Sequence, residues 1–382
     1  MSIKSWILVP LLVAGVSAQT LAGRQGAGAG APGRQAGGGT AGRQGARAGA
    51  NQPMFKAIWE RVAYTKDIDL HAVTCMAAEE CWAVGNTGTI LHTPDGGKTW
   101  QAQVGGDPEA ISEDDFYHVI FLDRTHGWAM TRRGKILGTT DGNTWAELST
   151  VSGTGKGVWF VSPQVGFEID NPDSTSQSTL RQSTDGGKTW RPVSRCSVDV
   201  MVDGLPRKLG CMMRTAQFLS PTVGFMGGGS GEVTVFGKTA DGGQTWTMSA
   251  IPEAKRNITG IHFWSPNEGI IVLDRGEEIH WTNDGGTTWT RSVTSRLWPS
   301  YYGVGAGKII VSAGEGNKQM GYSFNGGRNF TVRPFPAPAP VRSVTFFDAT
   351  NGMLVGDHAM VYRYRIVPIE YSSPGMIAAA AP

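Results

Sequence analysis

Thr93-Pro-Asp-Gly-Gly-Lys-Thr-Trp100 is the stretch that decides the fold of this 382-residue chain, because the chain repeats it. Close variants of the motif end at Trp145, Trp190, Trp246 and Trp289, and a diverged copy ends at Phe330. Counted from its third residue, the motif advances in steps of 46, 44, 56, 43 and 41 residues. One motif in every forty-odd residues indicates a stack of equivalent supersecondary units.

Each repeat carries the pattern of a four-stranded antiparallel sheet. A strand that ends in phenylalanine, such as Phe121, is followed six residues later by a glycine, such as Gly127, and then by an apolar residue. Residues 89–93 and 278–282 have the pattern of short third strands, and the Asp-Gly-Gly turn leads through tryptophan into a fourth. Four antiparallel strands per repeat are typical of a β-propeller blade.

The number of repeats predicts an all-β fold, a seven-bladed β-propeller. Six repeats carry the motif, and a seventh begins at Val341 and reaches its third strand at residues 360–365 without it. Residues 59–62 resemble the segments that follow the motif, so we expect this N-terminal strand to complete the last blade. Closing the ring with strands from both ends would remove the open sheet edges of a linear array.

The third residue of the motif is predicted to have a structural role. Its carboxylate, with the Ser or Thr hydroxyls of the motif, can accept hydrogen bonds from turn N–H groups. The glycines would take positive φ, and the tryptophan would fill the gap between blades. Calcium binding is the alternative, but one carboxylate per turn is far short of the six to eight oxygens that calcium takes. The positions concerned are Asp95, Asp141, Asp185, Asp241, Asp284 and Asn325.

The N-terminal segment has the pattern of a signal peptide over residues 1–18. Lys4 precedes an apolar run over residues 6–16, and small residues follow, although an uncleaved anchor is an alternative. Residues 19–52 are almost entirely Gly, Ala, Gln and Arg, which predicts a flexible linker. We expect the propeller to span residues 53–368, with a C-terminal tail over residues 369–382. The protein is accordingly expected to be secreted or periplasmic.

The four cysteines are predicted to form two disulfides. Cys75 stands where other repeats have the phenylalanine of the first hairpin, and Cys81 stands where they have the glycine. Cys196 and Cys211 flank an insertion that accounts for the 56-residue step between motifs. Paired replacement in an exported chain favours disulfides over free buried thiols, which are the alternative.

Charge and histidine spacing exclude several classes of function. The chain has 34 basic and 32 acidic residues, and five of the basic residues precede residue 53, where no acidic residue occurs. The propeller itself is therefore nearly neutral, which argues against a nucleic-acid partner. The sequence has no His-x-x-x-His and no Cys-x-x-Cys, so neither a metal site nor a cofactor is expected.

One face of the predicted ring is the candidate binding surface. In a propeller, the loops between second and third strands and the loops between blades open onto the same face. Mixed charge with aromatic side chains suits recognition of protein or carbohydrate, although an ordinary solvated rim is the alternative. The candidate partner-binding residues are Arg132, Arg133, Asp274, Arg275, Trp298, Tyr301, Asp357 and His358.

The repeated motif resembles the Asp-box, also called the bacterial neuraminidase repeat. The fuller unit over residues 81–100 is similar to the photosystem II stability/assembly factor family, and the resemblance covers about residues 55–366. It implies a non-enzymatic scaffold, without cofactors, that holds membrane-protein assembly intermediates partly through an arginine-lined surface. Arg132, Arg133 and Arg275 lie on the right kind of loop for such a surface. The chain departs from the pattern in its Gly/Ala/Arg linker and in having no lipid-attachment cysteine after the apolar run.

These observations predict an exported, monomeric scaffold that binds a protein partner and catalyses no reaction. The family resemblance implies that the partner is a membrane-protein assembly intermediate. The alternative is a carbohydrate-active propeller, either a sialidase-like glycoside hydrolase or a lectin. Against the sialidase alternative, the Phe-Arg-Ile-Pro signature of those enzymes is absent. Adjacent carboxylates such as Asp114 and Asp115 do not by themselves establish the opposed separation that glycoside hydrolysis needs.

Overall fold

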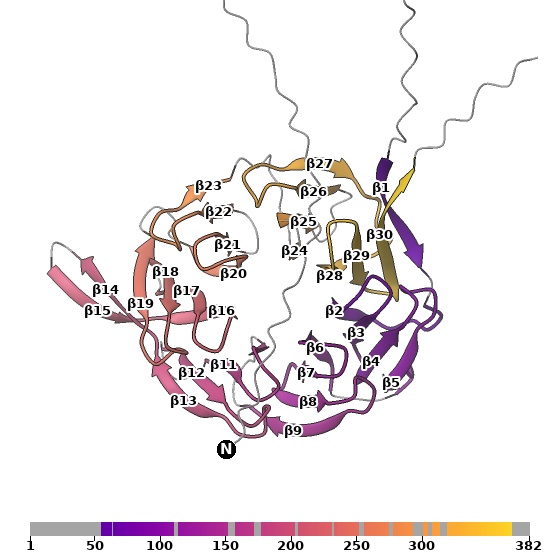
Figure 1. Cartoon of the computed structure of the whole chain (residues 1–382), viewed down its shortest axis with the longest axis horizontal. Coiled ribbons are helices and arrows are strands. Elements are labelled where there is room, and N and C mark those ends of the chain that lie inside the picture. The colour runs from indigo at the N-terminus through magenta and orange to yellow at the C-terminus, as the bar shows by residue number, and fades with distance from the viewer. Residues whose placement is uncertain are drawn as a thin grey trace, which may run out of the picture. The chain divides into compact units, whose positions relative to one another are not determined.

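Seven four-stranded antiparallel sheets are arranged as the blades of a propeller (Figure 1). The computed structural model describes residues 55–62, 64–110, 114–151, 157–171, 177–202, 205–230, 233–251, 256–274, 278–292, 301–304, 308–313 and 319–368. The predicted signal peptide, linker and C-terminal tail lie outside these residues. None of the helices in the described part of the chain is long and apolar enough to cross a membrane.

The first four blades follow the chain in order. Blade one contains β2 (Leu70–Cys75), β3 (Cys81–Gly85), β4 (Thr89–Thr93) and β5 (Gln101–Val104). Blade two contains β6 (Phe116–Phe121), β7 (Gly127–Thr131), β8 (Lys135–Thr139) and β9 (Ala146–Thr150). Blade three contains β10 (Val158–Phe160), β11 (Gly166–Asp170), β12 (Thr179–Ser183) and β13 (Arg191–Arg195). Blade four contains β16 (Met212–Phe218), β17 (Gly224–Ser230), β18 (Val233–Thr239) and β19 (Thr247–Ile251).

The remaining blades complete the ring. Blade five contains β20 (Ile258–Phe263), β21 (Gly269–Leu273), β22 (Glu278–Thr282) and β23 (Thr290–Arg291). Blade six contains β24 (Tyr301–Val304), β25 (Ile310–Ala313), β26 (Gln319–Ser323) and β27 (Thr331–Pro334). Blade seven contains β28 (Val341–Phe346), β29 (Asn351–Gly356), β30 (Met360–Pro368) and β1 (Phe55–Val62), and β1 pairs with β30 from Phe55↔Pro368 to Val62↔Val361.

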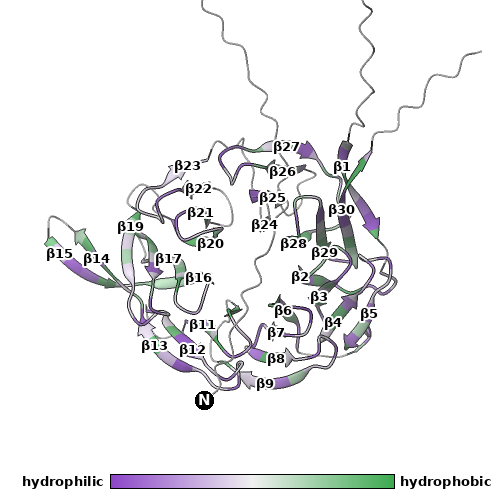
Figure 2. Ribbon diagram, in the orientation of Figure 1, coloured by the Kyte–Doolittle hydropathy of each residue, from purple (hydrophilic) through white to green (hydrophobic). Residues whose placement is uncertain are grey.

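The hydrophobic core lies between neighbouring blades, and one aromatic stack recurs in it. The aromatic residue that follows the hairpin glycine, or Cys81 in blade one, packs face to face on the phenylalanine of the next blade. The pairs are Trp82 with Phe121, Trp128 with Phe160, Phe167 with Phe218 and Phe225 with Phe263, with ring centroids 3.6–3.8 Å apart. Such stacks contribute about 0.5–1.5 kcal/mol each beyond the burial of their area. Figure 2 shows the hydrophobic residues of the inner strands against a more hydrophilic outer wall.

The hairpin glycine is required by close approach of a neighbouring ring rather than by an unusual backbone angle. Gly127 pairs with Phe121 across the first hairpin of blade two. A Cβ atom at Gly127 would lie 2.4 Å from the ring of Phe121. The same clash occurs at Gly166, Gly224 and Gly269, so the glycine of each hairpin leaves room for the phenylalanine six residues earlier.

The Asp-box turns have the predicted structure. Thr93 Oγ1 accepts a hydrogen bond from Gly97 N at 2.8 Å, and Asp95 accepts bonds from the N–H and hydroxyl of Thr99 at 2.8 and 2.7 Å. Gly96 and Gly97 have φ of 72° and 89°. The tryptophan side chains reach the preceding blade, where Trp190 Nε1 donates to Ser149 Oγ at 3.2 Å. The motif therefore joins blades as well as turning the chain.

Asp185→Ala is expected to lower the free energy of unfolding by about 1 kcal/mol, which is the usual net value of hydrogen bonds in this setting. Asp185 accepts hydrogen bonds from Ser183, Lys188 and Thr189, and its side chain is exposed, so the loss should lie at the low end of the range for hydrogen bonds. Urea unfolding of the variant measures the difference. A loss above 3 kcal/mol would contradict an exposed turn role.

Two disulfides hold local hairpins. Cys75 and Cys81 are bonded across β2 and β3, at the paired positions that the sequence predicted. Cys196 and Cys211 are bonded at the base of the insertion between blades three and four. That insertion is not an irregular loop but a hairpin of β14 (Ser197–Val202) and β15 (Leu205–Gly210). Figure 1 shows it projecting outward from the ring.

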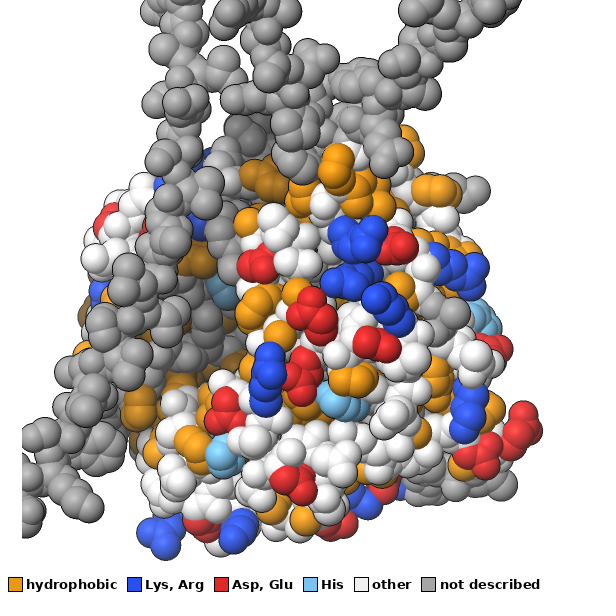
Figure 3. All heavy atoms as spheres, turned by 45° about the vertical axis from the view of Figure 1, so that its right-hand side comes forward, with side chains coloured by type: hydrophobic (Ala, Val, Ile, Leu, Met, Phe, Trp, Pro, Cys, Tyr) orange, Lys and Arg blue, Asp and Glu red, His pale blue; other side chains and the backbone are white. Residues whose placement is uncertain are grey.

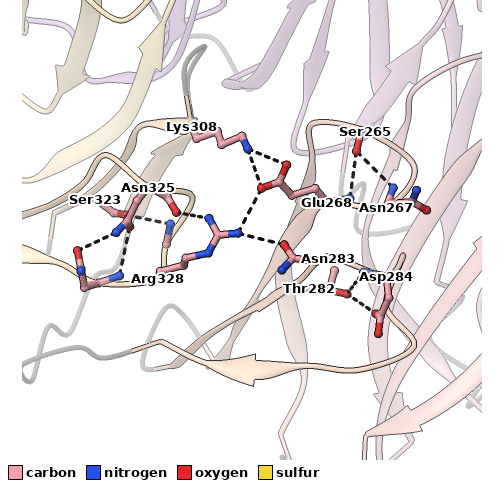
Figure 4. Close-up of polar contacts among 12 residues, drawn as sticks. Ser265, Asn267, Glu268, Thr282, Asn283, Asp284, Lys308, Ser323, Asn325 and Arg328 are labelled. Atoms are coloured by element: carbon pink, nitrogen blue, oxygen red, sulfur yellow. Dashed lines mark hydrogen bonds and ion pairs between the residues drawn. The ribbon is translucent and has the colours of Figure 1, made fainter. Parts of the chain in front are cut away.

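A charged network joins blades five and six on the Asp-box side of the ring (Figure 4). Glu268 accepts hydrogen bonds from Lys308 Nζ at 2.7 Å, and these bonds hold the pKa of its carboxyl below the usual range. Arg328, from the diverged sixth motif, donates to Asn283 at 3.0 Å and lies over the ring of Trp281. Arg328 thus links the sixth motif, which has Asn325 and Phe330 in place of the aspartate and tryptophan, to blade five.

Candidate functional site on the loop face

The face opposite the Asp-box turns carries the loops between second and third strands and the loops between blades; we call it the loop face. Its inner border is formed by the first strand of each blade. In five of these strands the register shifts by one residue at the same place, near the start of the strand. The extra residues are His71, Tyr117, Arg214, Thr259 and Arg342.

A β-bulge redirects the side chain of its extra residue and is common beside functional sites. The bulge can also be recognised in the sequence, because it breaks the strict alternation of buried and exposed positions in a strand. In β2, buried residues stand at Leu70, Val73 and Cys75, a spacing of three and then two, and β6 and β28 have the same pattern. The composition of the loops does not reveal these five residues, because they lie inside strands and only a break in strand periodicity marks them.

An aromatic and cationic cluster joins blades one and two on this face. The ring of His71 stacks on Tyr117 with centroids 4.1 Å apart, and the Arg132 guanidinium lies 4.3 Å from the centre of the same tyrosine ring. His71 Nε2 contacts Asn86 Oδ1 at 2.5 Å. Burial lowers the pKa of His71, and the nearby charge of Arg342 lowers it further, so the imidazole is neutral at neutral pH.

A second group of charges joins blades seven and one. Arg342 donates two hydrogen bonds to Asp357, from Nε and Nη2, both at 2.6 Å. His358 N donates to Asp69 Oδ1 at 2.9 Å, and its ring contacts Asp67 at 3.1 Å. His358 has a φ of 56°, so the backbone of this loop is fixed in a left-handed turn. Bidentate pairing and a fixed turn make this part of the loop face rigid.

The structure brings some predicted site residues together and separates others. Arg132 belongs to the His71–Tyr117 cluster, while Asp357 and His358 belong to the neighbouring group around Arg342. Arg133 is exposed beside Arg132. Asp274 lies apart in blade five, where its carboxylate accepts a bond from Asn257 N and faces Arg256 at 3.7 Å. Arg275 and Trp298 lie outside the described residues, and only the backbone of Tyr301 is described, in β24.

Three carboxylates of the loop face are already engaged by the protein. Asp115 accepts a hydrogen bond from Thr87 N at 3.1 Å, Asp274 from Asn257 N at 3.2 Å, and Asp357 is paired with Arg342. By contrast, Arg214 is exposed and forms no ion pair with the described residues. No group of three or more possible metal ligands occurs in the described part of the chain. The face thus presents aromatic rings and cations to a ligand.

On the outer wall, charge is mixed rather than concentrated. On the side shown in Figure 3, acidic and basic side chains are interspersed. Exposed ion pairs include the contact of Arg365 with Glu60 at 3.2 Å on the outer strands of blade seven and that of Arg124 with Glu80 at 2.8 Å on the Asp-box side. Such exposed pairs contribute little to stability or to steering a partner.

Comparison with known sequences points to one family. A family model described as photosynthesis system II assembly factor YCF48 matches residues 41–140. The photosystem II assembly lipoprotein Ycf48 of Trichormus variabilis is 22% identical over 234 residues, which cover 57% of this chain and 59% of the relative. The Ycf48 protein of a Synechococcus species is 34% identical over 77 residues, 20% of this chain and 18% of the relative. The chain thus aligns with less than two thirds of the length of these relatives.

Comparison with solved structures supports the fold. The structure of YCF48 bound to a D1 peptide has a TM-score of 0.57 at 17% identity and covers 83% of this chain and 98% of that one. YCF48 from Cyanidioschyzon merolae has a TM-score of 0.59 at 18% identity and covers 80% and 98%. Virginiamycin B lyase from Staphylococcus aureus, at 12% identity, has a TM-score of 0.59 and covers 82% and 100%, so the fold alone does not separate scaffold from enzyme. The chain is a seven-bladed Asp-box propeller similar to the photosystem II assembly factors.

Proposed function

We propose that this protein is an exported, non-enzymatic scaffold whose loop face binds a segment of a partner polypeptide. The observation that carries the proposal is the set of five aligned bulges, which turn aromatic, cationic and hydroxyl side chains to the inner border of one face. Aromatic residues and arginine are the side chains that dominate binding energy at protein interfaces. A related structure described as YCF48 bound to a D1 peptide supports a polypeptide as the ligand.

The charges favour a partner segment that carries acidic groups. Arg214 is exposed without an ion pair among the described residues, and Arg132 is exposed with its guanidinium against Tyr117. A carboxylate of the partner would gain charge-assisted hydrogen bonds from either arginine. Lectin activity would need free acceptor and donor groups, whereas the carboxylates Asp115, Asp274 and Asp357 already accept hydrogen bonds from the protein.

Two observations support export. Disulfides persist in oxidising compartments, and the protein contains Cys75–Cys81 and Cys196–Cys211. Relatives from Trichormus variabilis and Nostoc are named as lipoproteins. The signal peptide that we expect over residues 1–18 would give the same location. Mass spectrometry of the mature N-terminus tests it, and a chain that retains Met1 in a reducing compartment would contradict export.

Reversing the charge of both Arg132 and Arg214 is expected to reduce partner capture at least about tenfold, since each buried charged hydrogen bond is worth about 1.5–3 kcal/mol. The measurement is crosslinking and pull-down from native membranes and extracellular fluid, with recovered proteins quantified by mass spectrometry. The matched control reverses Arg124, in the turn between β6 and β7, and Arg191, directly after the third Asp-box; both side chains are exposed and lie toward the Asp-box side of the ring.

Equal loss of partner capture in both variants would show nonspecific charge effects and contradict the loop-face site.

The carbohydrate-active alternative predicts a different result. It would be supported by turnover of a sialoside, xyloglucan or chromogenic glycoside that disappears when Asp274 or Asp357 is replaced and the fold is preserved. Absence of such turnover would count against the carbohydrate-active alternative.

A further inference from the structure

Blade three carries charged side chains on a sheet face that is apolar in the two blades before it. Glu168 and Arg181 are paired across β11 and β12, and Asp170, two residues after Glu168, lies on the same face. In blades one and two, the positions of the Glu168–Arg181 pair hold the apolar pairs Ala83–Leu91 and Ala129–Leu137. Charges inside a blade are costly, so this departure from the repeat indicates a role other than packing.

A cavity of about 700 Å³ lies beside this face of blade three. Its volume is within the range of about 300–1,000 Å³ that is usual for ligand pockets. The register of β12 and β13 shifts at the cavity and leaves Val193 as the extra residue of a β-bulge, a feature that is common beside functional sites. The other lining residues used below are Asp170, Thr179, Arg181, Trp190 and Arg195.

Asp170 lines the cavity with a carboxylate oxygen that lacks a hydrogen-bond donor. The side chain is only 8% exposed, and its Oδ2 accepts a hydrogen bond from Arg181 Nη2. Its Oδ1 is buried and has no hydrogen-bond partner among the described residues. Buried polar atoms in folded proteins are nearly always paired, so Asp170 Oδ1 requires a donor from water or from a ligand in the cavity.

The groups that line the cavity define the chemistry of the ligand. Asp170 Oδ1 accepts a hydrogen bond, the exposed Arg195 donates, and the hydroxyl of Thr179 does both. An amine would meet the guanidinium groups of Arg181 and Arg195, and an anion would meet the carboxylate of Asp170. A neutral polyhydroxylated ligand meets neither repulsion, because each of its hydroxyl groups donates and accepts. Trp190 adds an aromatic ring, which suits the apolar face of a sugar.

We propose that the cavity on blade three binds a neutral saccharide, with Asp170 and Arg195 hydrogen-bonded to its hydroxyl groups and Trp190 against its ring. Hydrogen bonds to charged side chains are the stronger ones, so Asp170 and Arg195 supply most of the orientation of the sugar. The lining residues include none of the loop-face residues that the proposed function uses, so the saccharide site does not depend on that function.

Screening the full chain against neutral saccharides tests the proposal. The probes are an array of neutral di- and trisaccharides of glucose, galactose, mannose and N-acetylglucosamine, and calorimetry then measures the affinity for the strongest binder. We expect a Kd of about 1 mM or tighter. D170N and R195Q should each weaken binding at least about fivefold, because each removes a charged hydrogen-bonding group. R191Q is the matched control, since Arg191 is an exposed arginine of the same strand that does not line the cavity; it should bind as the unchanged protein does.

A second variant separates loss of binding from loss of folding. D170N also breaks the contact with Arg181, so T179F, which fills the cavity and keeps that contact, is measured beside it, and thermal unfolding checks both. T179F should abolish saccharide binding and keep the fold. The proposal is overturned if no saccharide binds at about 10 mM, or if binding persists in both folded variants. Reversing the charges of Arg132 and Arg214 should leave saccharide binding unchanged, so failure of the loop-face site is distinguished from failure of this one.

Discussion

Deleting residues 1–62 is expected to lower the melting temperature of the propeller by more than about 10 °C or to abolish cooperative folding, whereas deleting residues 1–52 should leave it unchanged. The first deletion removes β1, which forms the outer strand of blade seven and pairs with β30 along its whole length. The exposed edge of β30 would also become available for association with other chains.

Trp59 accounts for much of the expected loss. Its ring packs edge-on against Phe335, Phe346 and Tyr364, with centroids 5.2–6.2 Å apart. Its indole Nε1 donates to the hydroxyl of Tyr322 in blade six at 2.9 Å. The strand therefore connects blade seven to blade six by side chains as well as to β30 by its backbone.

A point variant distinguishes the contribution of the Trp59 side chain to stability from that of the backbone pairing of β1. Trp59→Ala is expected to cost about 3 kcal/mol, the lower part of the range for large aromatic truncations, because the side chain is only partly buried. Lys56→Ala on the same strand is the matched control and should change stability by less than about 0.5 kcal/mol, since Lys56 is exposed. Unchanged melting of both the Δ1–62 protein and Trp59→Ala would show that the ring is stable without β1.

The sequence predicted the periodic part of the fold well because each position of the repeat can be compared across several copies. The Asp-box turn, the paired cysteines at 75 and 81 and the third strands at residues 89–93 and 278–282 all follow from comparing repeats. Departures from the repeat were harder to interpret. The insertion after Cys196 is a hairpin, but a single copy of a segment gives no internal comparison.

The loop face was predictable only in outline. Loops such as residues 132–134 could be placed on one face by topology, yet their partners could not. The sequence does not show that Asp357 is neutralised by Arg342 or that Arg132 lies on Tyr117, because these contacts cross strands and blades. The bulged residues left a trace in the spacing of buried positions, and that trace is the feature most worth seeking in other propellers.

Glu168→Gln is expected to become progressively more stable than the unchanged protein as the pH rises from 4.5 to 8. Glu168 is 0% exposed, and its carboxylate oxygens have no hydrogen-bond partner among the described residues. Its position in β11 corresponds to Ala83, Ala129 and Met226 in other blades, where apolar side chains fill the core. Burial raises the pKa of Glu168 to about 8, against the attraction of Arg181, whose guanidinium pairs with Asp170.

The sign of the effect follows from proton linkage. The folded protein holds the Glu168 proton up to about pH 8, whereas the unfolded chain releases it near pH 4.5. Between these values the folded state binds more protons, so its stability falls as the pH rises, by a total of about 3–5 kcal/mol. Glutamine keeps the shape of the protonated carboxyl and does not ionise, so this fall should be absent from the variant.

The comparison must be made between variants because other groups titrate in the same range. Burial lowers the pKa of His71, His118 and His262, so these residues stabilise the fold as the pH rises through the unfolded value of 6.5 and partly hide the opposite contribution of Glu168. Subtracting the urea unfolding free energies of Glu168→Gln and the unchanged protein at each pH cancels the histidines. Glu147→Gln, at a 60% exposed side chain, is the control for the substitution of glutamic acid by glutamine itself. If the Glu168 difference does not change with pH, the carboxylate is ionised in the folded protein and Arg181 compensates its charge despite burial.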